Sequence, residues 1–164
     1  MKAILAILLL CLAFSTHAQL PVDPNTGKVV YSGSVPLPNG VTSTQAFGRA
    51  KVWLSDAFTG HATLAEDAAS GLLSGGGVER VKDFTYSFRV RLQVEANQVK
   101  YKLDDFTYTY LDPMSHTTKG GTAEEQRDSK LFMGKGTRAK MLAELDEKVR
   151  AGLGQLSGEL AGTL

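Results

Sequence analysis

Few residues in this chain have the type and spacing needed for chemistry. Beyond residue 18 there are two histidines, His61 and His116, and neither belongs to an i,i+4 pair or an HExxH motif that would hold a metal. Three pairs of adjacent carboxylates lie outside the predicted helices, but neighbours on a strand point to opposite faces, so they do not form a general acid–base pair. These pairs are Glu66-Asp67, Asp104-Asp105 and Glu124-Glu125. The sequence therefore predicts no catalytic residue, no metal site and no cofactor.

Two glycine-containing motifs resemble parts of nucleotide sites. Gly134-Lys135-Gly136-Thr137 is similar to a phosphate loop, but Ser129 occupies the position of the first glycine and Gly136 follows the lysine. We interpret this motif as a flexible break before a helix. The run Gly75-Gly76-Gly77 lacks the strand-to-helix setting of a dinucleotide site.

The best surface candidate is a set of four basic residues on one predicted hairpin. They alternate with apolar residues, so they should share its outer face: Arg89, Arg91, Lys100 and Lys102. Such a face could bind an anionic partner. The alternative is an ordinary solvated sheet face, which long cationic side chains often occupy.

The stretch from Phe84 to Tyr110 must position these residues. Apolar and polar residues alternate along both halves, which predicts a long antiparallel hairpin turning at Ala96-Asn97. In a regular register Phe88 would face Asp105, a carboxylate on the apolar side. One extra residue at Asp104-Asp105 removes this conflict and pairs Phe88 with Phe106. We therefore predict a β-bulge at that point.

The other elements complete one α+β domain. We expect a strand over residues 28–35, a helix over 41–58 that begins with a Thr42–Gln45 capping box, and two short strands within 61–78. A second helix should start at Thr137 and fray after Ala151, because glycines at 152, 154 and 158 weaken it. The predicted order is β-α-β-β-β-β-α, a two-layer sandwich with both helices on one face of an antiparallel sheet.

The N-terminus has the pattern of a secretory signal peptide. Lys2 precedes an apolar run from Ala3 to Phe14, and small or polar residues lead to Ala18, after which we expect cleavage. A lipoprotein signal at Cys11 is the alternative, but no small residue precedes it. The run is too short to span a membrane comfortably. We therefore expect a periplasmic or extracellular protein without a transmembrane span in its mature chain.

Cleavage at that point changes the composition. Cys11 is the only cysteine, so the mature chain would have none. Loss of Lys2 leaves 17 basic against 17 acidic residues, a neutral chain that does not fit a nucleic-acid binder. The expected division is a signal peptide over 1–18, a β-α-β(4) core over 19–111, a polar loop over 112–136 and a C-terminal helix over 137–164.

The chain also resembles a known family. The residues that carry the resemblance are Leu20-Pro21-Val22-Asp23, the segment from Gly27 to Gly33, the helix with Arg49-Ala50-Lys51-Val52-Trp53-Leu54, and the aromatic hairpin. This pattern is similar to the bacterial domain of unknown function 4468. The resemblance implies a secreted protein of a Gram-negative bacterium with a TBP-like fold. It implies no activity and no functional residue.

Three functional hypotheses remain open. The first is a non-enzymatic module that binds a protein, glycan or small ligand on the open sheet face or at the helix–sheet seam. The second is an envelope hydrolase with a site near Asp105 or His61. The third is a structural accessory that docks through its C-terminal amphipathic helix, whose leucines run from Leu142 to Leu160.

Overall fold

The computed structural model describes residues 20–58, 60–61, 65–128 and 134–162. The predicted signal peptide and Cys11 lie outside these residues. In chain order the elements are β1 (Tyr31–Pro36), α2 (Ser43–Asp56), β2 (Gly60–His61), β3 (Ala65–Asp67), β4 (Leu72–Val81), β5 (Phe84–Val94), β6 (Gln98–Leu111), β7 (Thr118–Thr122), α3 (Ala123–Asp128) and α4 (Lys135–Ala161).

The strands form a single antiparallel sheet in the order β1-β6-β5-β4-β2. Two short strands extend it, since β3 pairs with β4 and β7 pairs with β6. β6 therefore has two neighbours on its outer edge. β1 pairs with its first half, from Gln98 to Leu103, and β7 pairs with its second half, from Thr107 to Leu111.

The bulge predicted in the hairpin is confirmed. Val94 pairs with Val99 and Leu92 with Tyr101, but the register shifts between Ser87 and Arg89. The extra residue is on β6, where Asp105 has a φ of 55°. Beyond the shift, the rings of Phe88 and Phe106 stack with centroids 4.7 Å apart. One apolar face therefore continues past the bulge, as the alternation required.

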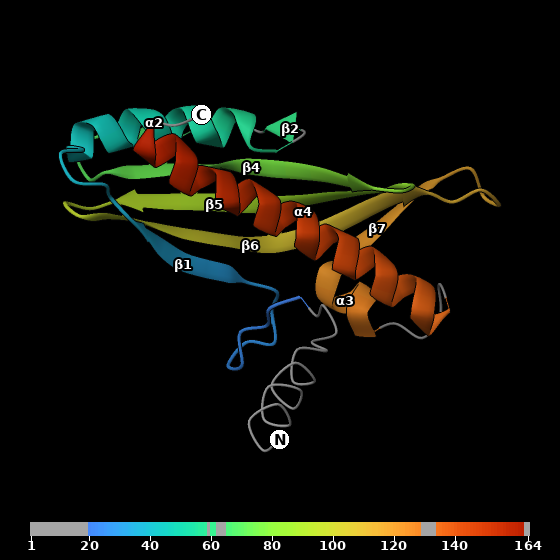
Figure 1. The fold of residues 1–164 in the computed structure, drawn as a ribbon. Coiled ribbons are helices and arrows are strands. Elements are labelled where there is room, and N and C mark those ends of the chain that lie inside the picture. Colours follow the sequence, from blue (N-terminus) through green and yellow to red (C-terminus); the bar gives the residue numbers. More distant parts are fainter. Residues whose placement is uncertain (1–19, 59, 62–64, 129–133, 163–164) are drawn as a thin grey trace, which may run out of the picture.

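Both long helices cover this apolar face, so the predicted two-layer α+β architecture is confirmed (Figure 1). α2 begins with the expected capping box, in which Thr42 and Gln45 exchange hydrogen bonds. α4 runs diagonally over the sheet, with its last turns beside α2 and its first turns near α3 (Figure 1). Its leucines pack into the core and are buried: Leu142, Leu145, Leu156 and Leu160.

The expectation that α4 frays after Ala151 is wrong. The helix continues to Ala161 because Gly152 and the last turn of α4 both contact α2 or the residues just after it. Gly152 is the point where α4 meets α2: a Cβ there would lie 2.7 Å from the Phe58 ring, and the Trp53 indole donates to the Gly152 carbonyl at 2.9 Å. Arg49 donates to the Leu160 carbonyl at 2.6 Å. This bond gives a partner to one of the last carbonyls of α4, which have no acceptor role inside the helix. Tertiary contacts outweigh the low helix propensity.

The polar loop expected over 112–136 is also wrong in part. A short strand, β7, and a short helix, α3, occupy most of its described residues, and α4 begins two residues before Thr137. β7 pairs with β6 through its backbone, so it needs no apolar alternation of its own. The β4 strand also extends beyond the predicted end at Val78, to Val81.

Candidate functional site

The open face of the sheet carries the four predicted basic residues, and each has a carboxylate partner. Arg91 and Lys102 both pair with Asp104, and Lys100 pairs with Glu95. Arg89 lies 2.9 Å from the Asp105 carboxylate. The stripe is therefore an ion-pair network rather than a row of bare cations, and the sequence alone does not reveal this compensation.

The network retains an excess of positive charge. Lys28, on the segment before β1, is a fifth cation and lies 3.9 Å from Asp105. Five cations thus share three carboxylates: Lys28, Arg89, Arg91, Lys100 and Lys102 with Glu95, Asp104 and Asp105. Asp104 is only 6% exposed, whereas the side chains of Arg89, Lys100 and Lys102 remain about half exposed. Asp105 and Glu95 are 42% and 33% exposed, so the exposed part of this network carries both signs, with more cations than carboxylates.

A shallow hollow of about 500 Å³ lies beside the network. Its floor consists of short side chains and glycines of β4 and β5, including Ser74, Gly76 and Ser87, and Thr107 of β6 also lines it. The Arg89–Asp105 pair forms part of its wall. Sequence reasoning missed this hollow, although the glycine run in β4 was its signal: Gly76 leaves space on the open face, while Gly75 and Gly77 face Leu54 and Phe88 on the covered face.

The two residues of the hydrolase hypothesis are not brought together. His61 belongs to β2 and Asp105 to β6, and two strands, β4 and β5, separate them. Three strand spacings amount to about 14 Å. Asp105 is an exposed bulge residue that contacts two cations, Arg89 and Lys28. This arrangement does not support an acid–base site built from this pair.

A second small cavity lies at the helix–sheet seam. Its volume is about 310 Å³, and it is lined by the start of α2 and by the turns that follow β3 and β5. The lining is mostly small and neutral, with Ser43, Thr44, Ser70 and Ala96 among its residues and Glu95 as the one charged group. The seam therefore offers little charge for fixing a ligand.

Buried polar groups at the other end of the seam contact one another. The Tyr86 hydroxyl donates to Gln126 at 2.7 Å, and Lys148 lies 3.8 Å from the buried carboxylate of Glu79. The Tyr31 hydroxyl donates to the Asp146 carboxylate at 2.8 Å, and Arg150 donates to the same carboxylate at 2.9 Å. These groups join α3 and α4 to the sheet, so we assign them a structural role.

Among the described residues, no cluster of three or more His, Cys, Asp or Glu side chains could hold a metal. No helix in the same part of the chain is sufficiently long and apolar to cross a membrane.

Comparison with known proteins adds evidence about the fold. No family model matches the chain, and no curated protein matches it. Among solved structures, a TBP-like protein from Parabacteroides distasonis matches with a TM-score of 0.64 and 15% identity, covering 84% of this chain and 96% of that one. A DUF4468 family protein from Bacteroides ovatus matches with a TM-score of 0.57 and 16% identity, covering 84% and 90%.

At this identity the likeness concerns the fold alone. It extends over most of the length of both proteins rather than over one shared motif. The resemblance drawn from the sequence is therefore confirmed as a structural one: the chain shares its fold with a TBP-like protein and with a DUF4468 family protein.

Proposed function

We propose that the protein is an exported, non-enzymatic binding module whose open sheet face takes an acidic segment of a partner protein. The observation that carries the proposal is the hollow beside Arg89, on a face that neither long helix covers. A partner side chain could enter the hollow, where the hydroxyls of Ser87 and Thr107 offer hydrogen bonds. A glycan or a small ligand is the alternative occupant, but the surplus of cations favours carboxylates.

The charge argument predicts strong salt dependence. The side chains of Arg89 and Lys100 are 55% and 54% exposed, so added salt screens them readily. Each cation would be shared between its present carboxylate and those of the acidic segment. Binding should therefore weaken steadily as the salt concentration rises.

A photo-cross-linking amino acid in place of Ser87 tests the proposal in the producing cell. It should capture a partner that the same group at Val52, on the outer side of α2, does not capture. The double variant Arg89→Glu/Lys100→Glu should lower the yield at least about tenfold, since two favourable charges become repulsive. Equal yields from Ser87 and Val52, or an unchanged yield in the double variant, would contradict the proposal.

Export is tested separately. Mass spectrometry of the protein from its host should find Gln19 as the first residue, as expected for cleavage after Ala18. A chain that retains residues 1–18 would contradict the exported part of the proposal and leave the sheet-face part to its own experiment.

A further inference from the structure

We infer a second binding site, for an anionic amphiphile with one alkyl chain, at the opposite end of the molecule from the α2–α4 crossing. A cavity of about 910 Å³ lies between the segment before β1, α3 and the first turns of α4. This volume falls within the usual range for small-molecule sites, roughly 300–1,000 Å³. The site is distinct from the sheet-face hollow and shares no lining residue with it.

One wall of the cavity is apolar. Leu20 and Leu142 are almost completely buried, and Val22, which is 40% exposed, extends the apolar surface outward. Ala139 and Ala143 continue it along α4. Positions 139, 142 and 143 fall on one side of a helix, so these three residues form a continuous stripe. This wall suits an alkyl chain.

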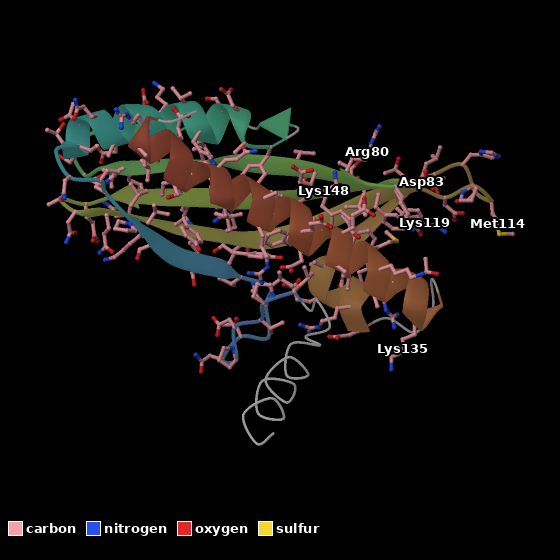
Figure 2. The ribbon with its side chains drawn as sticks, in the orientation of Figure 1. Arg80, Asp83, Met114, Lys119, Lys135 and Lys148 are labelled. Atoms are coloured by element: carbon pink, nitrogen blue, oxygen red, sulfur yellow. The ribbon has the colours of Figure 1, made fainter. Side chains whose placement is uncertain are left out.

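The rest of the lining is cationic. It contains four basic side chains from α3 and α4: Arg127, Lys135, Arg138 and Lys140. Arg127 is paired with Asp128 at 2.8 Å. This ion pair, and to a smaller extent the charge of Arg138, lower the pKa of the Asp128 carboxyl. No salt bridge joins Lys135, Arg138 or Lys140 to a carboxylate within the described part of the chain. Figure 2 shows Lys135 at the N-terminal end of α4.

One of these groups already lacks a partner. The Nη1 atom of Arg138 is buried and has no hydrogen-bond acceptor among the described residues. A buried guanidinium N–H without an acceptor is costly, and an anionic oxygen is its natural partner. The first turn of α4 also contains no acidic residue, so the positive end of the helix dipole adds to the local charge.

The apolar wall and the cationic lining together indicate which class of ligand fits the cavity. A free phosphate would leave the apolar wall unused, and a neutral lipid would leave three cations unpaired. A fatty acid or an alkyl phosphate satisfies both parts, with its chain along the Leu142 stripe and its head group near Arg138. The carboxylate and phosphate head groups share this chemistry, and separate titrations distinguish them.

Isothermal titration calorimetry with the purified protein tests the inference. Dodecanoate and dodecyl phosphate, each below its micelle concentration, should bind with a stoichiometry near one. Dodecanol and inorganic phosphate should bind at least about tenfold more weakly. Equal binding of dodecanol would overturn the cationic part, equal binding of phosphate would overturn the apolar part, and no binding of any probe would overturn the site.

Two variants locate the binding. Lys135→Glu/Lys140→Glu changes exposed residues, and it should weaken dodecanoate binding at least about tenfold while leaving the thermal midpoint nearly unchanged. Ala143→Phe should block the apolar wall with the charges intact. Arg89→Glu/Lys100→Glu on the sheet face is the matched control and should bind dodecanoate normally. Normal binding in the first two variants, or loss in the control, would contradict this location.

Discussion

The two halves of the β5–β6 hairpin both bury one face of the sheet, but they do so with different residues. Between the turn and the bulge, the core pairs are aliphatic or mixed, such as Val94 with Val99 and Val90 with Leu103. Beyond the bulge they are aromatic, and Phe84 stacks on Tyr110 with centroids 4.9 Å apart. The outer face changes at the same point, from an ion-pair network to neutral hydroxyl residues such as Thr107 and Thr109.

The helical layer follows this division. Over the turn-proximal half, Leu54 of α2 packs against Gly75 of β4, and Phe58, just after α2, contacts Phe88 at the bulge. Over the distal half, α3 reaches the tyrosines through Gln126. The difference indicates that the bulge is a boundary between two packing environments. The proposed sheet-face site lies at this boundary, where Arg89 and Asp105 meet.

Deleting Asp105 should have the largest effect. The bulge would vanish, and Phe106, Tyr108 and Tyr110 would turn to the solvent face. Three exposed aromatic side chains cost about 5–9 kcal/mol, which is comparable to the stability of a whole domain. Urea unfolding should show loss of most or all cooperative stability.

The matched control keeps the residue count. Asp105→Gly removes the exposed contact with Arg89 but accepts the positive φ without strain, so its unfolding free energy should stay within about 1 kcal/mol of the original. If the deletion variant were as stable as the glycine variant, the bulge would not be the boundary.

Two glycine substitutions test the helical layer, where α4 crosses the end of α2. Gly152→Ala places a methyl group against the Phe58 ring and should destabilise the protein by about 1–3 kcal/mol. Gly154→Ala meets no atom within 4 Å and should stabilise α4 by up to about 1 kcal/mol through helix propensity. Denaturant unfolding of both variants provides the measurement. Equal effects would show that α2 and α4 do not meet as closely as Gly152 requires.

An alkaline titration compares buried Tyr86 of the distal half with buried Tyr31 of β1, which pairs with Leu103 of the turn-proximal half. Burial raises the pKa of Tyr86 to about 12. Burial, and then the hydrogen bond to Asp146, raise the pKa of Tyr31 well above its ordinary value. Because the unfolded pKa is about 10, each tyrosine contributes stability that is complete below pH 10 and is lost as the pH rises toward its folded pKa.

The variants Tyr86→Phe and Tyr31→Phe should each make stability fall less steeply above pH 10. Urea midpoints between pH 9 and pH 12, with tyrosinate absorbance recorded in parallel, measure the effect. If stability fell with pH equally steeply in Tyr86→Phe and in the original protein, the Tyr86 hydroxyl would be in contact with water. The distal half would then not be the buried aromatic environment described above.

The smallest expected effect concerns the loop between β6 and β7, where Figure 2 shows Met114 far from the helices. Hydrogen bonds from Lys119, then from the Met114 amide and the Ser115 hydroxyl, lower the pKa of Asp112. The carboxylate therefore stabilises the loop above about pH 4, and this contribution is lost as the pH falls toward the lowered folded pKa.

Asp112→Asn should speed hydrogen exchange of the loop roughly five- to tenfold at pH 7 without changing global unfolding. At pH 2 the two proteins should exchange at more similar rates. A large global destabilisation would instead show that the loop and the distal half unfold as one unit.

Much of the fold could be predicted because the hairpin encodes it directly. Strict alternation on both sides of Asp104-Asp105 leaves one consistent register, so the bulge follows from the sequence. β7 and α3 could not be predicted, since β7 is a glycine-containing edge strand held by backbone pairing to β6. The full length of α4 was missed because Gly152 is needed for close packing against Phe58, a residue far away in sequence.

The candidate sites were less predictable than the fold. The four basic residues were correctly placed on one hairpin face, but their partners depend on where the bulge turns Asp104 and Asp105. The cavity at α4 was missed although Lys135, Arg138 and Lys140 precede an apolar helical stripe. Spacing alone does not show that Leu20 would complete its wall.

The bulge has one more consequence, for the protein's tendency to aggregate. β6 is the longest strand, and its outer edge would otherwise expose a long row of unpaired amides and carbonyls to other molecules. Instead β1 and β7 cover it in two short pieces with the bulge between them, and Pro36 ends the first piece. On the opposite edge β2 and β3 contain only two and three residues. No long, flat edge is offered by these four strands, so the large sheet can keep one face open without recruiting further strands into a fibril.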